Sequence, residues 1–168
     1  MDSAEAIIAA LQLAPLPGEG GYYRETYRSE LEIPPADLPA SYGAARNAST
    51  AIFYLLTADT FSALHRLPGD EVFHFYLGDP VEMLQLHPDG TGELLRIGND
   101  IAQGQRPQVV APGGSWQGAR LATGGAFALM GTTVAPGFEF ADYEGADRRE
   151  LLASYPTFAG LIEALTAE

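Results

Sequence analysis

Short stretches in which apolar and polar residues alternate dominate the middle of the chain, and turn signals separate them. Such alternation is typical of half-buried β-strands. Clusters such as Gly78-Asp79-Pro80 and Pro88-Asp89-Gly90 mark the turns. Strand candidates spaced about 8–12 residues apart predict an all-β sandwich or barrel. The candidates are residues 22–28, 50–56, 60–66, 71–77, 81–86, 93–97, 107–111, 115–121 and 126–134.

Helical spacing of apolar residues is confined to the two ends of the sequence. One helix is predicted over residues 3–13 and a helical segment over about 144–167, with acidic residues in its first turns. No helix is expected within residues 50–135. Residues 29–48 are rich in proline and are expected to form an irregular excursion. The acidic residues in question are Asp142, Glu144 and Asp147.

Length and composition narrow the class of protein. A chain of 168 residues fits one domain, expected to span residues 1–168, because domains average ~150 residues. The formal net charge of −13 disfavours nucleic acid and anionic membranes as partners. The sequence contains no cysteine and no lysine, which excludes a thiol nucleophile and a Schiff base. No signal peptide or membrane span is expected, and a cytoplasmic location follows as the default.

A histidine and a glutamate are joined by a tight turn between two predicted strands. His65 ends the first strand, and a period of two places it on one face with Phe61 and Ala63. After the Pro68-Gly69 turn, Glu71 begins a series of inward-facing residues in the second strand. The same period puts Phe73, Phe75 and Leu77 on the face of Glu71. His65 and Glu71 are therefore expected to meet in the mouth of the barrel.

The spacing around these residues resembles the cupins. The first cupin motif is His-x-His, three or four residues, Glu, six residues and Gly; the second is Pro-x-Gly, two residues and His. The chain has His65, Glu71 and Gly78 at the first spacing and Pro112-Gly113-Gly114 at the second. The four positions at which cupins hold a metal ion read His65, Leu67, Glu71 and Gln117.

The resemblance is closest to one group, cupin family 5, a domain of unknown function. It covers nearly the whole chain and implies a double-stranded β-helix, or jelly roll, similar in fold to the dTDP-sugar 3,5-epimerases. It also implies a homodimer, for which the alternating aromatic residues of 22–28 suggest an interface. The blocks that carry the resemblance are residues 21–29, 65–71, 74–80, 107–112 and 134–140.

The residues at the four metal-ligand positions decide which cofactor the resemblance implies. Leucine cannot bind a metal and glutamine is a weak donor, so only His65 and Glu71 remain as strong ligands. Catalytic metal sites commonly have three protein ligands. No cofactor is therefore expected, and a weakly held divalent metal at His65 and Glu71 is the alternative.

A metal-free pocket with an acid and a base is the preferred interpretation. Histidine can take up a proton near neutral pH, so His65 is the candidate base, with Glu71 as its orienting partner or as the base itself. The resemblance to the epimerases suggests a phenol as the opposing acid, either Tyr76 or Tyr23. Arg24 is a candidate for holding an anionic group. Alternatively, His65 and Glu71 only satisfy each other in a polar plug.

Other candidates have two open interpretations each. His74 lies on the opposite face from Glu71 in a regular strand, so it either lines the pocket or packs elsewhere. Trp116 either lines a ligand slot or belongs to the core, and Gln117 is expected on the cavity wall.

The function predicted from these residues is binding of a small polar molecule, carbohydrate-like or anionic, in the barrel. The chain is then a metal-independent epimerase or isomerase, a non-catalytic binding module, or a cupin with a weak metal site. The same pocket serves the first two, so the sequence leaves both open.

Overall fold

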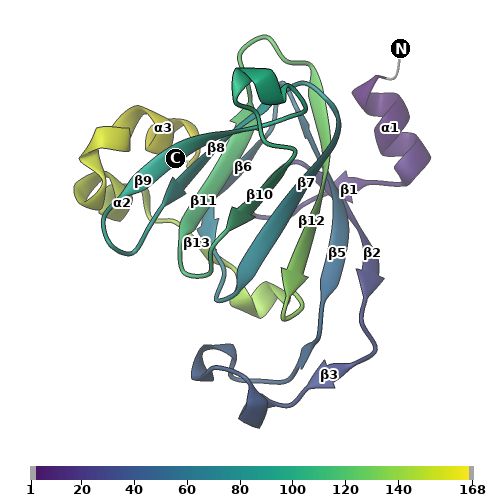
Figure 1. The fold of residues 1–168 in the computed structure, drawn as a ribbon, viewed down its shortest axis with the longest axis vertical. Coiled ribbons are helices and arrows are strands. Elements are labelled where there is room, and N and C mark those ends of the chain that lie inside the picture. Colours follow the sequence, from purple (N-terminus) through teal and green to yellow (C-terminus); the bar gives the residue numbers. More distant parts are fainter. Residues whose placement is uncertain (1–2, 167–168) are drawn as a thin grey trace.

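Two antiparallel sheets face each other in the computed structural model, which describes residues 3–166 (Figure 1). The expected domain 1–168 thus includes four residues, 1–2 and 167–168, that lie outside the described residues. In order, the first sheet contains β1 (Ala14–Pro15), β2 (Tyr22–Arg28), β5 (Thr50–Thr57), β12 (Phe127–Ala135), β7 (Asp70–Gly78) and β10 (Gln108–Ala111). The second contains β13 (Glu144–Gly145), β6 (Phe61–Arg66), β11 (Trp116–Leu121), β8 (Val81–Leu86) and β9 (Gly92–Ile97).

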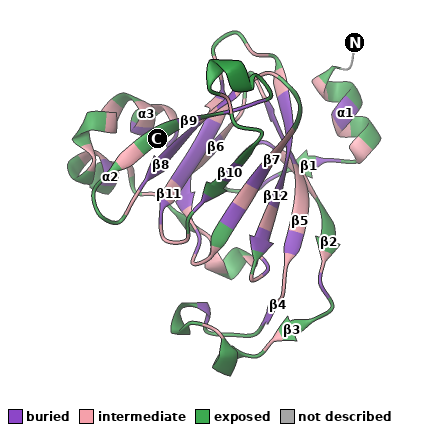
Figure 2. Cartoon of the chain, viewed as in Figure 1, coloured by how far each residue is buried: buried purple, intermediate pink, exposed green. Residues whose placement is uncertain are grey.

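The all-β class and the jelly-roll arrangement predicted from the sequence are confirmed. Each long strand lies within a residue or two of its predicted range, because alternation and turn residues are local signals. The excursion at 29–48 has some structure of its own. It contains the short pair β3 (Glu32–Ile33) and β4 (Arg46–Asn47) and the 3₁₀ turns η1 (Pro35–Asp37) and η2 (Ala40–Tyr42). Most of it is exposed (Figure 2).

The helices lie at the two ends of the described chain, as predicted. Helix α1 (Ala4–Leu11) begins where the hydroxyl of Ser3 accepts a hydrogen bond from the backbone N–H of Ala6. The second helical region comprises α2 (Arg148–Ser154), the 3₁₀ turn η5 (Pro156–Phe158) and α3 (Ala159–Ala164). Among residues 3–166, no helix is long and apolar enough to cross a bilayer.

Two details differ from the sequence expectation. Only Asp147 caps α2, whereas Asp142 ends the 3₁₀ turn η4 (Phe140–Asp142) and Glu144 belongs to β13. Both acidic residues pair with arginines instead, as described below. A 3₁₀ turn, η3 (Ile101–Gln103), also lies inside the region expected to hold strands alone. The carboxylate of Asp100 accepts from the N–H of Gln103, and Gly104 ends the turn at a φ of 78°.

The apolar side chains form three clusters. The largest lies between the two sheets and includes Tyr54, Phe73, Met83 and Met130. A second joins the outer face of the five-stranded sheet to α2 and α3, and a third joins α1 to the outer face of the six-stranded sheet. The two sheets, with a helix or helices on each outer face, thus form a filled barrel rather than an open shell.

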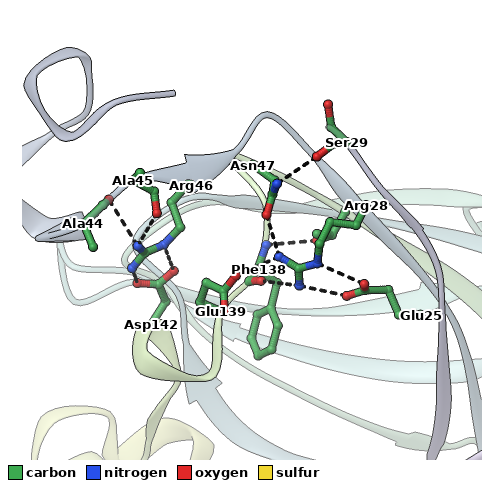
Figure 3. A network of polar contacts seen from close by, with 11 residues as sticks. Glu25, Arg28, Ser29, Ala44, Ala45, Arg46, Asn47, Phe138, Glu139 and Asp142 are labelled. Carbon is green, nitrogen blue, oxygen red and sulfur yellow. Dashed lines mark hydrogen bonds and ion pairs between the residues drawn. The ribbon is translucent and has the colours of Figure 1, made fainter. Parts of the chain in front are cut away.

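A buried ion pair ties the excursion to the segment that follows β12. The guanidinium of Arg46 donates to both carboxylate oxygens of Asp142, at 2.8 and 2.5 Å (Figure 3). Its remaining N–H groups donate to the backbone carbonyls of Ala44, Ala45 and Tyr42. Both side chains are at least nine-tenths buried, at 5% and 7% exposure. The pair therefore fixes the path of two loops that meet at one end of the barrel.

We predict that Asp142→Asn destabilises the fold by about 3–5 kcal/mol, since it leaves the buried Arg46 charge unpaired. Glu144→Gln makes the same chemical change in an exposed pair with Arg66 and should cost about 1 kcal/mol or less. Urea unfolding of both variants measures the difference. Equal losses would show that Arg46–Asp142 has no special role in holding the loops.

Candidate functional site

An irregular pairing brings His65 to the inside of the barrel. Gln117 pairs with His65, but Ala119 pairs with Ser62, so β6 has one more residue than β11 in this interval. Such a β-bulge reverses the facing of the residues on either side of it. Phe61 therefore packs toward the C-terminal helices, and the expectation that it shares a face with His65 is wrong. The inward direction of His65 itself was predicted, but for the wrong reason.

The hydrogen bonds of His65 define its protonation pattern. Its Nδ1 lies 2.7 Å from the carbonyl oxygen of Ala63. Because a carbonyl oxygen only accepts, Nδ1 carries the proton, and Nε2 of the neutral ring has a free lone pair. The nearby Oε2 of Glu19 is 3.8 Å from Nε2, beyond hydrogen-bonding distance. Among residues 3–166, Nε2 therefore has no hydrogen-bond partner, although His65 is only 2% exposed.

Glu19 is held beside His65 by a glycine turn. Its backbone carbonyl accepts from the N–H of Ala63, and its Oε1 accepts from the hydroxyl of Ser62 at 2.8 Å. Gly20 and Gly21 follow with φ values of 101° and 71°, a region that favours glycine. The buried hydroxyl of Tyr54 donates to the carbonyl of Gly20 at 2.9 Å. The turn and β6 together aim the carboxylate at the histidine.

Glu71 enters the same end of the barrel from β7. Its Oε2 accepts a hydrogen bond from Nε2 of Gln117 at 2.7 Å, and the side chain is buried. Burial raises the pKa of Glu71 above its ordinary value, and the negative charge of Glu19 adds to the rise. His65, Thr132 and Gln117 act in the opposite direction by favouring the carboxylate. The net effect makes Glu71 a carboxyl group that holds its proton more strongly than an exposed glutamate.

These side chains line a cavity of about 430 Å³. It lies at the end of the barrel where β5 begins and β12 ends, and residues 138–140 form part of its wall. Its carboxylates are Glu19, Glu25, Glu71 and Glu139. Its hydroxyl groups come from Tyr23, Thr50, Tyr54 and Thr132, and its apolar residues include Leu16, Ile52, Leu67, Val134, Phe138 and Phe140.

Arg28 closes one side of this cavity with a complete set of hydrogen bonds. It donates to both oxygens of Glu25, at 3.0 and 2.9 Å, and to Glu139 at 2.7 Å (Figure 3). It also donates to Oδ1 of Asn47 and to the carbonyl of Phe138. A guanidinium group has five N–H donors, so all of them are used. Arg28 thus fastens β2 to the segment after β12 and has no donor left for a ligand.

Tyr143 covers the other side of His65. Its ring stacks on the imidazole with centroids 4.9 Å apart and an interplanar angle of 19°. Burial and the charge of Glu19 raise the pKa of Tyr143 to about 12. The phenol is therefore neutral over the ordinary pH range. Glu144, the next residue, forms an ion pair with Arg66 that holds Tyr143 near β6.

Two predicted site residues on β7 lie outside the cavity. Tyr76 is 47% exposed and its ring meets that of Phe53 edge to face, at 6.1 Å. His74 contacts the hydroxyl of Thr133 and the amide of Gln108. A break in the pairing with β12 falls opposite Tyr76 and turns Leu77 away from the face of Glu71 as well. The structure therefore does not bring Tyr76 or His74 together with His65.

The other candidates are divided between the cavity and the outside. Tyr23 lines the cavity, as does Glu71. Arg24 borders the cavity, but its guanidinium group is 5.8 Å from the ring of Phe53, which packs toward α1 on the outer face.

Gln117 is buried behind Glu71 rather than on the wall of the cavity. Trp116 packs in the cluster of the C-terminal helices, with Arg66 over its ring at 4.5 Å.

Sequence reasoning missed Glu19 and Tyr143. Glu19 lies between Gly18 and Gly20-Gly21, and a carboxylate inside a glycine cluster is a local signal that could have been followed. Tyr143 reaches His65 only because β13 pairs with β6. Arg66 in β6 and Glu144 in β13 form an ion pair although they are 78 positions apart in the chain. No sequence spacing reveals that contact.

Two antiparallel sheets with a polar cavity at one end define the double-stranded β-helix of the cupins. The chain matches the cupin superfamily family DUF985 over residues 5–146 and belongs to it. It is 31% identical over 134 residues to the uncharacterized protein YML079W of Saccharomyces cerevisiae, covering 74% of this chain. The chain spans 66% of the length of that relative, just under two-thirds.

Solved structures agree with this family assignment. A hypothetical protein from Leishmania major superposes with a TM-score of 0.89 at 31% identity, covering 99% of this chain and 100% of its own. Protein SO0799 from Shewanella oneidensis gives 0.87 at 33% identity, with 99% of each chain covered. The oxalate decarboxylase of Bacillus subtilis gives 0.54 at 14% identity, covering 92% of this chain and 37% of its own. This last similarity concerns the fold alone.

The residues of this cavity do not fit the metal site that the cupin fold implies. Mn(II) centres occur in the oxalate decarboxylase. Here Leu67 presents an alkyl group to the cavity, and the amide of Gln117 is directed at Glu71. Among residues 3–166, no three histidine, aspartate or glutamate side chains converge closely enough to hold one metal ion. His65 and Glu71 alone are fewer than the three protein ligands that a catalytic metal site commonly has.

We predict that Glu71→Gln raises the melting temperature at neutral pH. A carboxyl whose pKa is raised by folding makes the fold lose stability as pH rises above the unfolded value, because the unfolded chain then releases its proton first. The neutral amide removes this penalty, and Tm rises by about 2–4 °C for each kcal/mol relieved.

The gain in melting temperature over the native protein should shrink as the pH falls below the pKa of a glutamate in the unfolded chain, which is about 4.3. Thermal unfolding across this pH range checks it. A gain that is the same at every pH would contradict a raised pKa of Glu71.

Proposed function

We propose that the chain binds a small polar, carbohydrate-like molecule in the 430 Å³ cavity and acts on it as a metal-independent epimerase or isomerase. The observation that supports this is the pairing of two groups with opposite tendencies. His65 lines the cavity with an Nε2 that has no hydrogen-bond partner among the described residues, and burial raises the pKa of Glu71. A histidine nitrogen open to the cavity beside a carboxyl group of raised pKa is the combination of base and acid that this chemistry needs.

The chemistry follows from these two states. Nε2 of His65 takes a proton from a carbon next to a carbonyl group, so that the C–H bond breaks and its electrons form an enolate. The carboxyl of Glu71 donates a hydrogen bond to the carbonyl oxygen, where the negative charge develops. Epimerisation needs a second proton donor on the other face of the carbon, a role open to the phenol of Tyr23, while Nε2 keeps the proton it took until solvent removes it. Isomerisation instead returns the proton from Nε2 to the neighbouring carbon, while the carboxyl of Glu71 gives its proton to the carbonyl oxygen and takes the proton of the neighbouring hydroxyl group.

The surroundings support this division of roles. The Ala63 carbonyl holds the histidine tautomer, and the stacked ring of Tyr143 holds its plane. Gln117 orients Glu71 from behind. Tyr76 has no part in the proposal, and Tyr23, which lines the cavity, remains the phenol available as a second acid.

The test is hydrogen exchange in D₂O. The protein is incubated with a panel of ketoses, aldoses and keto-deoxysugars, and deuterium at the carbon next to the carbonyl is followed by NMR. We expect incorporation that falls ~100-fold or more in His65→Gln, the range that a general base contributes. His74→Gln is the matched control, since that histidine lies outside the cavity, and it should exchange at the native rate.

Saturable binding without any exchange would instead support a non-catalytic binding module. A loss of exchange that accompanies a fall in Tm of several degrees in His65→Gln would indicate a structural plug. Neither result is expected, because His65 lines the cavity and its Nε2 has no hydrogen-bond partner among the described residues.

We further propose that the whole chain is one cupin domain and that it forms a homodimer. The outer face of the six-stranded sheet exposes Tyr27, Tyr76 and Val110. β2 pairs with β1 only at Tyr22 and Tyr23, which leaves most of its outer edge unpaired. The cytoplasmic location stays a prediction from the sequence.

Light scattering over a wide concentration range tests the dimer. We expect twice the mass of the chain for the native protein and a shift toward the monomer in Tyr27→Glu or Tyr76→Glu. A charge placed at an exposed position elsewhere, as in Leu94→Glu, is the control and should leave the mass unchanged.

A further inference from the structure

Carboxyl groups outnumber basic groups at the inner end of the cavity. Glu19 and Glu71 both reach it, and His65 is the one basic side chain among residues 3–166 that meets them there. The arginines that border the cavity are engaged elsewhere. Arg28 has used all five donors, and the guanidinium of Arg24 lies by Phe53. An anionic ligand would therefore meet the carboxylate of Glu19 and no arginine side chain directed into the cavity.

Two free acceptor atoms lie at this end. Oε2 of Glu19 remains after Ser62 has taken Oε1. The other is Nε2 of His65, which is buried and lacks a hydrogen-bond partner among the described residues. Glu71 is not counted, because its carboxyl group is the hydrogen-bond donor of the proposed reaction. A primary ammonium group has three N–H donors and no acceptor, so two of its donors match these two acceptors.

The spacing of these two acceptors suits an ammonium group. Nε2 of His65 and Oε2 of Glu19 are 3.8 Å apart. An ammonium nitrogen lies ~2.7–2.9 Å from each of its acceptors, so one nitrogen can be within reach of both atoms.

The mouth of the cavity adds aromatic surface. Phe138 and Phe140 line it with their rings 5.2 Å apart and edge to face, and Tyr23 lies on the wall from β2. Aromatic faces attract cations and pack against the C–H faces of small polar molecules. The inner acceptors and the outer aromatics thus suit a polyol that carries an amine.

We propose that the ligand of this cavity carries a protonated primary amine, as an amino sugar does, and that Glu19 is the residue that selects it. This inference rests on the proposed function, since it uses the same cavity. The inference assigns a binding role to Glu19. It replaces the anionic ligand expected from Arg24 with a cationic one.

The test uses four matched probes: D-glucosamine, D-glucose, N-acetyl-D-glucosamine and D-glucuronate. Binding is measured by ligand-observed NMR at a pH of about 6, below the pKa of an amine. We expect D-glucosamine to bind at least ~10-fold more tightly than the other three probes, equivalent to ~1.4 kcal/mol. Glu19→Gln, which keeps the hydrogen bond from Ser62, should remove that preference, and His74→Gln should preserve it.

Ser62→Ala is the second variant. It removes the hydroxyl group that orients the carboxylate of Glu19 and should reduce the preference for D-glucosamine, so the result does not depend on the folding of one mutant. Equal binding of the four probes, a preference for D-glucuronate or no binding of D-glucosamine would overturn the inference. The proposed function would survive any of these, because exchange lost in His65→Gln is measured separately on keto sugars. A D-glucosamine preference that persists in Glu19→Gln would also overturn it, since the selecting residue would be another.

Discussion

The placement of two carboxyl groups at one end of a largely apolar barrel is the constraint on which the site depends. The side chain of Glu71 is buried and that of Glu19 is 13% exposed, and like charges with little water between them repel strongly. The fold offsets this with hydrogen bonds from Ser62 and Gln117, and burial together with the charge of Glu19 raises the pKa of Glu71. The acid–base role that we propose uses the same raised pKa, so the cost in stability and the proposed chemistry have one origin.

The arginines around this site act as structural fasteners. Arg28 and Arg46 each spend all their donors on carboxylates, carbonyls and an amide, and each joins the excursion or β2 to the segment after β12. That segment supplies Phe138, Phe140 and Tyr143 to the cavity and its surroundings. Because an arginine with satisfied donors offers little to a ligand, the charge of the cavity is set by its glutamates.

The comparison with other cupins separates fold from chemistry. The barrel superposes on an oxalate decarboxylase with a TM-score of 0.54 at 14% identity, although Leu67 and Gln117 stand where metal ligands are expected. The relatives near 30% identity share nearly the whole architecture. A shared barrel allows different reactions because a few side chains at its open end define the site.

The sequence by itself determined the strands, their turns and the inward direction of Glu71, because alternation and turn residues act over a few positions. The inward direction of His65 depends on the bulge in β6, which the period of two does not contain. The sequence also indicated the missing metal ligands, since Leu67 and Gln117 are a matter of residue identity. The tertiary structure alone decided what surrounds them. A bulge in β6 turned Phe61 outward, a glycine turn delivered Glu19, and β13 carried Tyr143 onto His65. Bulges and long-range pairings depend on partners far along the chain, so no local pattern contains them.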